Sequence, residues 1–335
     1  MGIPVRELLE GALLESLGLV IMAGEKGLGK EVSTSRIQKP GLLLTGLLEE
    51  LHPDRLQIFG AAEIGYLTSL SKEKLLRSLR VLEKADIPAI IVTRGLEPPD
   101  FLIALCSGKD VPLLKTALTS SVLIEGVTKY LEERLAPSTN VHGVFVDVLG
   151  VGVLVIGKSG IGKSECALDL VSRGYRLVSD DVVIVKRMPP ATLIGTASDL
   201  IRYHMEIRGL GIVNIKDIYG ITAIRERKQM DIVVELVRWE TEADYDRLGL
   251  ETSTYRILGV DLPYLKIPVS PGRSVATIVE VAARNQILKI MGHDSAKVLA
   301  AHLAGVMRRG VRKDQICFEG AGGSDRLGVL LKDIR

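Results

Sequence analysis

The amino-acid sequence predicts an α/β protein with two domains. The chain has 335 residues, more than a single hydrophobic core usually fills. Segments with a helical spacing of apolar residues alternate with short apolar runs typical of buried strands, which is the pattern of α/β folds. A glycine-rich loop between such a strand and such a helix, at residues 157–164, indicates nucleotide binding in the second half of the chain.

The first domain is predicted over residues 1–135. Its elements in chain order are a helix, two strands, a helix, a strand and two helices, over residues 1–18, 19–24, 56–60, 71–86, 87–95, 111–118 and 120–135. In the helix at 71–86 the leucines recur every three or four residues, and Ser71 suits the N-cap. The polar segment 136–140 breaks the last helix, and we place the domain boundary there.

The second domain is predicted over residues 136–310. Valine-rich segments form two strands that turn at Leu149-Gly150, and a helix over 164–174 follows the glycine-rich loop. The remaining elements are three strands and two helices, over residues 175–187, 212–220, 230–239, 273–292 and 295–309. Residues 311–335 contain the glycine-rich run Glu319–Ser324, which does not favour a helix, and we expect a mobile extension there.

Composition and charge exclude several classes of protein. Lys and Arg total 43 and Asp and Glu total 41, so the net charge of +2 argues against a protein that neutralises a nucleic-acid backbone. Only 4% of residues are aromatic, too few for an extended base-stacking surface. No run approaches the ~18 apolar residues of a membrane span, and the three cysteines form no CxxC pair of a zinc site. We therefore expect a cytoplasmic enzyme or binding protein with no nucleic-acid or membrane partner.

The loop at 157–164 matches the phosphate-loop pattern G-x-x-x-x-G-K-[ST] in full. Its glycines let backbone N–H groups converge on phosphate oxygens at a helix N-terminus. Lys163 is expected to reach the β- and γ-phosphates of ATP, and the Ser164 hydroxyl to bind Mg²⁺. The alternative is a tight turn that only joins a strand to a helix. The nucleotide-binding residues predicted are Gly157, Lys158, Ser159, Gly160, Ile161, Gly162, Lys163 and Ser164.

A second glycine-rich loop, Gly24–Lys30, has the same glycine and lysine spacing. Its next residue is Glu31, whose negative charge does not suit a phosphate-bound metal ion. No helical pattern follows, so no helix N-terminus would face the loop. We interpret this loop as a structural turn.

Two adjacent carboxylates, Asp180 and Asp181, interrupt the apolar strand predicted at 175–187. Neighbouring side chains of a strand point to opposite faces, so the two carboxylates are expected to have different roles. One would meet the metal ion or a metal-bound water, and the other the γ-phosphate and a substrate hydroxyl. The alternative is an ordinary turn, although no Gly, Pro or Asn lies beside the pair.

A third polar group consists of Glu206 and Arg208, which share one face of an extended segment. A carboxylate beside a guanidinium suits a site for Mg²⁺ and phosphate. A surface ion pair explains the spacing equally well. Gly209 and Gly211 would allow the backbone to approach a ligand.

Five motifs, in this order, resemble one known family, the HPr kinase/phosphorylase of bacteria. They are GKSGIGKS, LVSDD, MEIRGLGIVN, DYDRLGLE and IPVSPGR, and the similarity spans nearly all of residues 1–310. The resemblance implies ATP-dependent phosphorylation of a serine of HPr, the small carrier protein of the sugar phosphotransferase system. It also implies the reverse reaction, in which inorganic phosphate attacks the phosphoserine and pyrophosphate is released. Members of the family are homohexamers whose C-terminal domain holds the active site, in a fold that resembles phosphoenolpyruvate carboxykinase.

The same resemblance implies roles for individual residues. Lys163 corresponds to the phosphate-loop lysine, and Asp181 to the catalytic acid and base. Ser164 and Glu206 correspond to the Mg²⁺ ligands, with Asp180 beside the metal ion.

Further residues are implied by the remaining motifs. His142, which by sequence alone is a strand-edge histidine, corresponds to an active-site histidine, and Arg247 to an arginine that faces the transferred phosphate. Lys158 departs from the family, which often has an acidic residue there. The loop associated with dephosphorylation is formed by Ile267, Pro268, Val269, Ser270, Pro271, Gly272 and Arg273.

Two other functions remain open at the level of sequence. One is a small-molecule kinase or carboxykinase-like phosphotransferase on the same nucleotide core, which would need a compact substrate pocket. The other is a non-catalytic nucleotide sensor, which would not require the carboxylates and arginines described above. Residues 1–135 carry no catalytic constellation, and we expect them to serve assembly or regulation.

Overall fold

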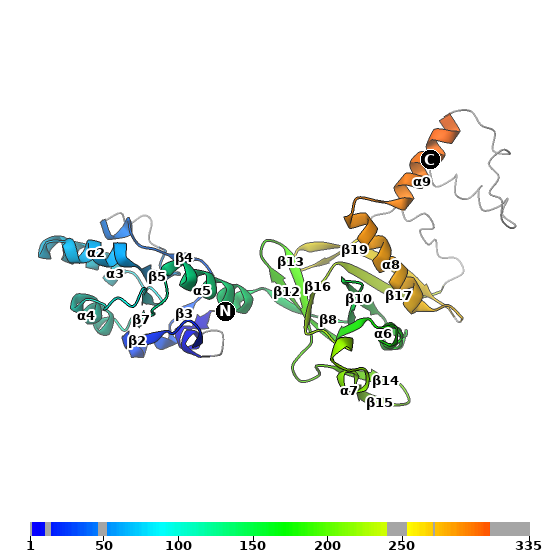
Figure 1. Cartoon of the computed structure of the whole chain (residues 1–335), viewed down its shortest axis with the longest axis horizontal. Helices are drawn as coiled ribbons and strands as arrows, with labels where there is room; N and C mark the ends of the chain where they lie inside the picture. Colours follow the sequence, from blue (N-terminus) through cyan, green and yellow to red (C-terminus); the bar gives the residue numbers. More distant parts are fainter. Residues whose placement is uncertain (1, 11–14, 46–51, 240–252, 271, 309–335) are drawn as a thin grey trace. The chain divides into compact units, whose positions relative to one another are not determined.

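The computed structural model describes residues 2–10, 15–45, 52–239, 253–270 and 272–308. The chain divides into two compact units, Met1–Ala136 and Pro137–Arg335. Each unit combines helices with sheets, so the α/β class predicted from the sequence is confirmed (Figure 1). Among the helices that the structure describes, none combines the length and the apolar character needed to cross a bilayer.

The first unit is built around a five-stranded sheet with the order β2-β7-β6-β5-β4. Four neighbouring strands run parallel and β2 is antiparallel at one edge. The strands are β2 (Val20–Ala23), β4 (Ile37–Gln38), β5 (Leu56–Phe59), β6 (Ile90–Val92) and β7 (Leu113–Lys115).

Helices cover both faces of this sheet, which explains why its inner strands are buried throughout. Side chains of α2, α3 and α4 pack in one cluster with Phe59, and side chains of α5 pack in another with Leu56 and Ile58. The helices are α2 (Ala61–Ser69), α3 (Lys72–Lys84), α4 (Asp100–Gly108) and α5 (Ser120–Leu135).

Two elements predicted for this unit are wrong. Within the predicted helix at 1–18, Ile3–Pro4 form β1, which pairs with β3 (Glu31–Val32), and Val5–Leu9 form a short 3₁₀ helix. The predicted helix at 111–118 is instead the buried strand β7. The segment 111–118 is a short apolar run, for which periodicity does not separate helix from strand, and pairing with neighbouring strands decides. Helices α2 and α4 were not predicted.

The second unit contains a six-stranded sheet with the order β11-β9-β10-β17-β19-β18. The predicted turn between β9 and β10 is confirmed, with positive φ at Leu149 and Gly150, as a two-residue hairpin requires. β10, β17 and β19 run parallel, so their carboxyl ends lie at the same edge. The strands are β9 (Val144–Val148), β10 (Val151–Gly157), β11 (Arg176–Ser179), β17 (Ile232–Arg238), β18 (Thr254–Ile257) and β19 (Val260–Val269).

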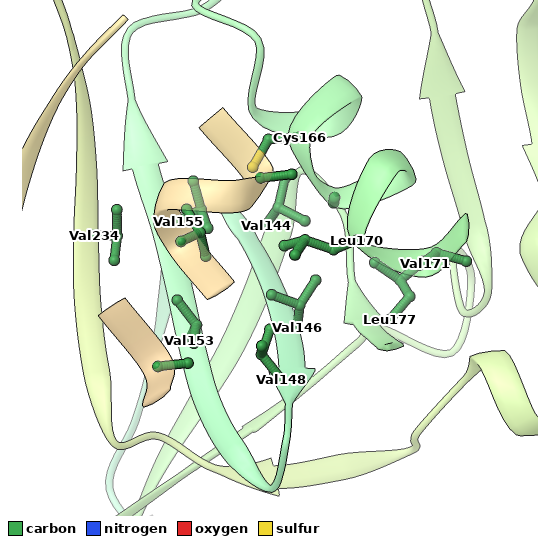
Figure 2. Close-up of a cluster of buried hydrophobic side chains, with 14 of the residues drawn as sticks. Val144, Val146, Val148, Val153, Val155, Cys166, Leu170, Val171, Leu177 and Val234 are labelled. Carbon is green, nitrogen blue, oxygen red and sulfur yellow. The ribbon is translucent and has the colours of Figure 1, made fainter. Parts of the chain in front are cut away.

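Two helices cover one face of the six-stranded sheet, α6 (Lys163–Ser172) and α8 (Val275–Ile290). Figure 2 shows valines of β9 and β10 directed toward Cys166 and Leu170 of α6. These valines alternate along each strand because successive side chains point to opposite faces. The buried face therefore fixes α6, which begins at the phosphate loop.

A four-stranded antiparallel sheet with the order β16-β13-β12-β8 packs on the other face. Phe145 and Leu154 of the large sheet contact Val183 and Leu193 of the small one in a second core. The strands are β8 (Ser138–His142), β12 (Val182–Met188), β13 (Thr192–Thr196) and β16 (Arg227–Gln229).

Two further predictions are wrong in this unit. The strand predicted at 175–187 is broken into β11 and β12, which belong to different sheets. The strand predicted at 212–220 is only β15 (Gly211–Asn214), which pairs with β14 (His204–Ile207), and a short helix α7 (Ile215–Tyr219) follows. The Asn214 side chain accepts hydrogen bonds from the Lys216 and Asp217 backbone, which caps this helix. The last described helix, α9 (Ser295–Arg308), lies where it was predicted.

The contact between the two sheets gives a test of the fold. A Cβ at Gly195 of β13 would lie 2.5 Å from the Phe145 ring, so Gly195→Ala should lower the free energy of unfolding by about 1–3 kcal/mol. Gly65→Ala in α2 is the matched control, because its Cβ would meet no atom within 4 Å and alanine favours a helix. Thermal melting of the whole chain measures both. Melting of the Gly195 variant at the wild-type temperature would contradict this packing.

Candidate active site

The phosphate loop joins β10 to α6, and three glycines give the loop its shape. Gly157, Gly160 and Gly162 have φ of 145°, 78° and 103°, values that favour glycine. A Cβ at Gly157 would also lie 2.5 Å from the Leu236 carbonyl oxygen on the neighbouring strand β17. The loop ends at the N-terminus of α6, where unpaired backbone N–H groups favour an anion.

The loop forms one wall of a cavity of about 210 Å³. The ammonium group of Lys163 lies against the loop backbone, where Nζ donates to the carbonyl oxygens of Gly157 at 3.1 Å and Lys158 at 3.3 Å. All three polar groups singled out in the sequence reach this cavity, although they lie far apart in the chain. The lining residues are Val144, Ser159, Gly160, Gly162, Lys163, Ser164, Glu165, Asp180, Asp181, Glu206 and Arg208.

Asp180 and Asp181 form a tight turn between β11 and β12, and not part of one strand as predicted. The Val182 N–H donates to the Asp180 carbonyl at 2.8 Å, and Asp181 has a φ of 65°. A turn closed by such an i to i+2 bond around a positive φ is rare and strained. The alternation of side chains along a strand therefore does not apply, and both carboxylates line the cavity.

Asp180 connects the turn to the phosphate loop. Its carboxylate accepts a hydrogen bond from the Ser164 hydroxyl at 2.9 Å and another from the Glu206 backbone N–H at 3.2 Å. Only 5% of Asp180 is exposed. Burial raises the pKa of Asp180, and the hydrogen bonds from Ser164 and Glu206 oppose that rise only in part.

The third polar group lies on the hairpin of β14 and β15. Glu206 is in β14, and Arg208 follows where the hairpin turns. The Arg208 guanidinium lies against the phosphate loop, because a Cβ at Gly160 would be 2.9 Å from its Nη2 atom. A glycine at position 160 therefore leaves room for this arginine.

His142 lies at the end of β8, beside the carboxylate turn. It is in register with Val182 of β12, and the next residue, Gly143, donates its N–H to the Asp181 carbonyl at 2.9 Å. A Cβ at Gly143 would lie 2.6 Å from the Val155 carbonyl oxygen, so the close approach of these strands requires glycine. The exposed His142 is thus a neighbour of Asp181 through strand pairing.

The donor atoms of the cavity suit a magnesium nucleotide. Ser164, Asp180 and Glu206 offer oxygen atoms, which Mg²⁺ prefers. Within the described part of the chain, no group of three or more His, Cys, Asp or Glu side chains is placed to hold a metal ion by itself. Mg²⁺ commonly takes one or two carboxylates together with phosphate oxygens and water, so this donor set fits the ion when a nucleotide phosphate completes it.

Two family models together match most of the chain. The family model of the HPr serine kinase N terminus matches residues 3–131, and that of the HPr serine kinase C-terminal domain matches residues 133–303. The chain belongs to the HPr serine kinase family. The phosphate loop, the carboxylate turn and the β14–β15 hairpin all lie within the C-terminal domain of this family.

Individual relatives cover most of the chain. The HPr kinase/phosphorylase of Geobacter sulfurreducens is 56% identical over 281 residues, which are 84% of this chain and 88% of that protein. That of Geobacillus thermodenitrificans is 42% identical over 300 residues, 90% of this chain and 97% of that protein. The solved structure of the Hpr(Ser) kinase/phosphatase from Coxiella burnetii is 32% identical, covers 48% of this chain and 98% of its own, and has a TM-score of 0.44.

Other residues implied by the family resemblance do not line the cavity or lie outside the described residues. Ile267, Pro268 and Val269 belong to β19, whose carboxyl end shares an edge with β10. Beyond it, the Arg273 N–H donates to the Ser270 carbonyl at 3.3 Å, and Gly272 has a φ of 82°. Arg247, Pro271 and the extension at 311–335 lie outside the described residues.

The second glycine-rich loop is a structural turn, as predicted. Glu25–Gly29 form a 3₁₀ helix followed by the strand β3, so the loop precedes no α-helix. A Cβ at Gly24 would lie 2.0 Å from the Val111 carbonyl oxygen, which accounts for the glycine there. Lys30 forms an ion pair with Asp86 at 2.7 Å.

Two lining residues, Val144 and Glu165, were not singled out from the sequence. Glu165 directly follows Ser164, so its position after the phosphate-loop motif was an available signal. Val144 gave no such signal, because it is one of several valines in a buried strand and only the folding of β9 brings it to the cavity.

The raised pKa of Asp180 predicts how stability depends on pH. Ionisation of this buried group destabilises the folded state. The free energy of unfolding of the wild type should therefore fall, relative to that of Asp180→Asn, as the pH rises through the pKa of Asp180 in the folded state. Thermal melting of both proteins with a chelator, from about pH 4 to about pH 8, measures this difference. A difference that stays constant with pH would contradict burial as the dominant cause.

Proposed function

We propose that this chain phosphorylates a serine of HPr with ATP and reverses the reaction with inorganic phosphate, releasing pyrophosphate. The observation that carries the proposal is the Ser164–Asp180 hydrogen bond, which joins a phosphate loop to a carboxylate turn in a chain of the HPr serine kinase family. The names of the relatives, HPr kinase/phosphorylase, support both directions.

In the kinase direction, the phosphates of ATP bind at the loop and the N-terminus of α6. Asp181 accepts the proton of the HPr serine hydroxyl as its oxygen attacks the γ-phosphorus. The bond from the γ-phosphorus to the bridging oxygen breaks, and ADP leaves with that oxygen. Lys163 stabilises the negative charge that develops on the bridging oxygen.

In the reverse direction, inorganic phosphate occupies the position of the departing nucleotide phosphate. One of its oxygens attacks the phosphorus of phosphoserine, so that a phosphoanhydride bond forms and the bond to the serine oxygen breaks. Asp181 returns its proton to that serine oxygen, and pyrophosphate leaves. The same carboxylate acts in both directions, as microscopic reversibility requires.

The carboxylates of Asp180 and Glu206 have different roles around the phosphates. Ser164 and Glu206 would hold Mg²⁺, and Asp180, which is buried and accepts a hydrogen bond from Ser164, orients the Ser164 hydroxyl. When bound, Mg²⁺ supplies charge neutralisation at the phosphate oxygens. Arg208 lies against the phosphate loop and adds positive charge to the same cavity.

We extend the proposal to the whole protein from the family resemblance. The C-terminal domain would be catalytic, with a core similar to that of phosphoenolpyruvate carboxykinase, and the N-terminal domain would serve assembly or regulation. The protein would act in the cytoplasm as a homohexamer, with His142 and Arg247 in the active site. The loop at 267–273 would serve the phosphorylase reaction.

The two glycine-rich loops supply a matched test of nucleotide binding. Lys163→Ala should lower turnover of HPr phosphorylation by about a hundredfold or more, because a charge at the transferred phosphate is lost. Lys30→Ala removes the lysine of the other loop, together with its ion pair to Asp86, and should leave turnover within about twofold. Phosphoserine formation from labelled ATP measures both. Equal losses in the two variants would contradict the assignment of the phosphate loop.

The proposed proton acceptor is tested by Asp181→Asn. This variant keeps the size of the side chain and removes its basicity, so turnover should fall by about 10²–10⁴-fold in both directions. Phosphoserine formation from ATP and pyrophosphate release from phosphorylated HPr are the measurements. A variant whose kinase turnover stays within about tenfold of wild type would rule out this role of Asp181.

A further inference from the structure

Arg173, at the carboxyl end of α6, lies outside the cavity and holds two helices together. Its guanidinium makes a two-point contact with Asp169 of α6, at 3.0 Å from Nε and 2.9 Å from Nη2. The same group reaches α8, where Nη2 donates to Ser274 at 3.1 Å and Nη1 to Thr277 at 2.9 Å. A longer contact of 3.4 Å joins Nη1 to Glu280.

These contacts involve the whole guanidinium group of Arg173. A guanidinium has five N–H donors in a fixed planar arrangement, and the five contacts of Arg173 engage all three of its nitrogen atoms. Lysine has no planar fork and does not reproduce this geometry. An exposed ion pair needs only one such contact and contributes little to stability, whereas Arg173 makes five.

The two helices lead directly to two loops at one edge of the sheet. α6 begins with Lys163 and Ser164 of the phosphate loop. The N-cap of α8 is Ser274, whose side chain accepts from the Thr277 N–H, and the residue before it is Arg273. β10 and β19, which precede the two loops, run parallel on either side of β17, so both loops leave the same edge.

Arg273 is oriented at that edge by an aromatic ring. Its guanidinium carbon lies 6.0 Å from the centre of the Trp239 ring, the residue that follows β17. The Trp239 N–H donates to the Val269 carbonyl at 3.2 Å, so the ends of β17 and β19 are joined there. A movement of the α8 N-terminus therefore changes the place of Arg273 relative to the phosphate loop.

We propose that Arg173 is a positioning residue for phosphoryl transfer, which fixes the spacing between the phosphate loop and Arg273 by joining α6 to the N-cap of α8. This role rests on the proposed function, because it concerns where the loop that contains Arg273, assigned there to the phosphorylase reaction, lies relative to the phosphate loop. An error of about 1 Å in such a placement costs up to about a hundredfold in rate. Arg173 touches no substrate and acts through the two helices.

The test compares a variant that removes both sides of the contact with a variant that removes part of its α8 side only. Arg173→Ala removes both sides, and Thr277→Val removes one acceptor on α8 while keeping the shape of the side chain. Arg77→Ala is the matched control, because Arg77 pairs with Glu73 at 2.6 Å one turn away on α3 and contacts neither α6 nor α8. Thermal melting of each variant reports any general loss of stability.

Kinetics separate positioning from a structural role. Arg173→Ala should lower kcat for pyrophosphate release from phosphorylated HPr about tenfold or more with KM for inorganic phosphate within about twofold, and Thr277→Val should act in the same direction. The double variant should be no slower than Arg173→Ala alone, because both remove one interaction. The Arg77 variant should match wild type. Three results would overturn the proposal: additive effects of the two substitutions, a wild-type kcat in Thr277→Val, or variants in which only the melting temperature changes.

A second measurement does not depend on catalysis. Trp239 is the single tryptophan of the chain, and its fluorescence reports the position of Arg273. The emission should change in the Arg173 and Thr277 variants and not in the Arg77 variant. Unchanged emission in the first two would overturn the coupling of the helices. If wild type phosphorylates no HPr, the proposed function fails, and the fluorescence still decides whether Arg173 holds the two loops.

Discussion

The hydrogen bond from Ser164 to Asp180 joins the two parts of the chain on which the site depends. Ser164 stands at the start of α6, whose apolar face is fixed against the six-stranded sheet. Asp180 stands where the chain leaves that sheet at the end of β11 and enters the four-stranded sheet at β12. The change of sheet requires a sharp turn, and the turn exposes two carboxylates to the phosphate loop. The chemistry of the cavity thus follows from a constraint on the path of the backbone.

The parallel strands of the large sheet explain where the remaining groups lie. β10, β17 and β19 deliver three connections to one edge, the region in which open α/β sheets bind ligands. Valines on one face hold α6 and α8, and larger side chains on the other face hold the small sheet. The residues that line the cavity are therefore carried by a rigid scaffold, and Arg173 adds a polar link between its two helices.

The sequence was sufficient for features that depend on local chemistry. The phosphate loop, the turn at Leu149-Gly150 and the α/β class follow from glycine spacing and apolar periodicity. The turn at Asp180-Asp181 was missed because an unbroken apolar context suggested one strand, and only pairing with two different sheets breaks it. His142 illustrates the same limit, since its nearness to Asp181 comes from the pairing of β8 with β12. The contacts of Arg173 with α8 span over a hundred residues of sequence and leave no local pattern.

In the proposed function, the carboxylate turn and the phosphate loop hold one phosphoryl group between them. A crystal structure of the whole protein with ADP, Mg²⁺ and inorganic phosphate tests this claim most directly. We expect the nucleotide phosphates at the N-terminus of α6 beside Lys163 and the metal ion at Ser164. The Asp181 carboxylate should lie within hydrogen-bond distance of the free phosphate, about 2.5–3.0 Å. Phosphate bound away from Asp181, or nucleotide bound away from the loop at 157–164, would contradict it.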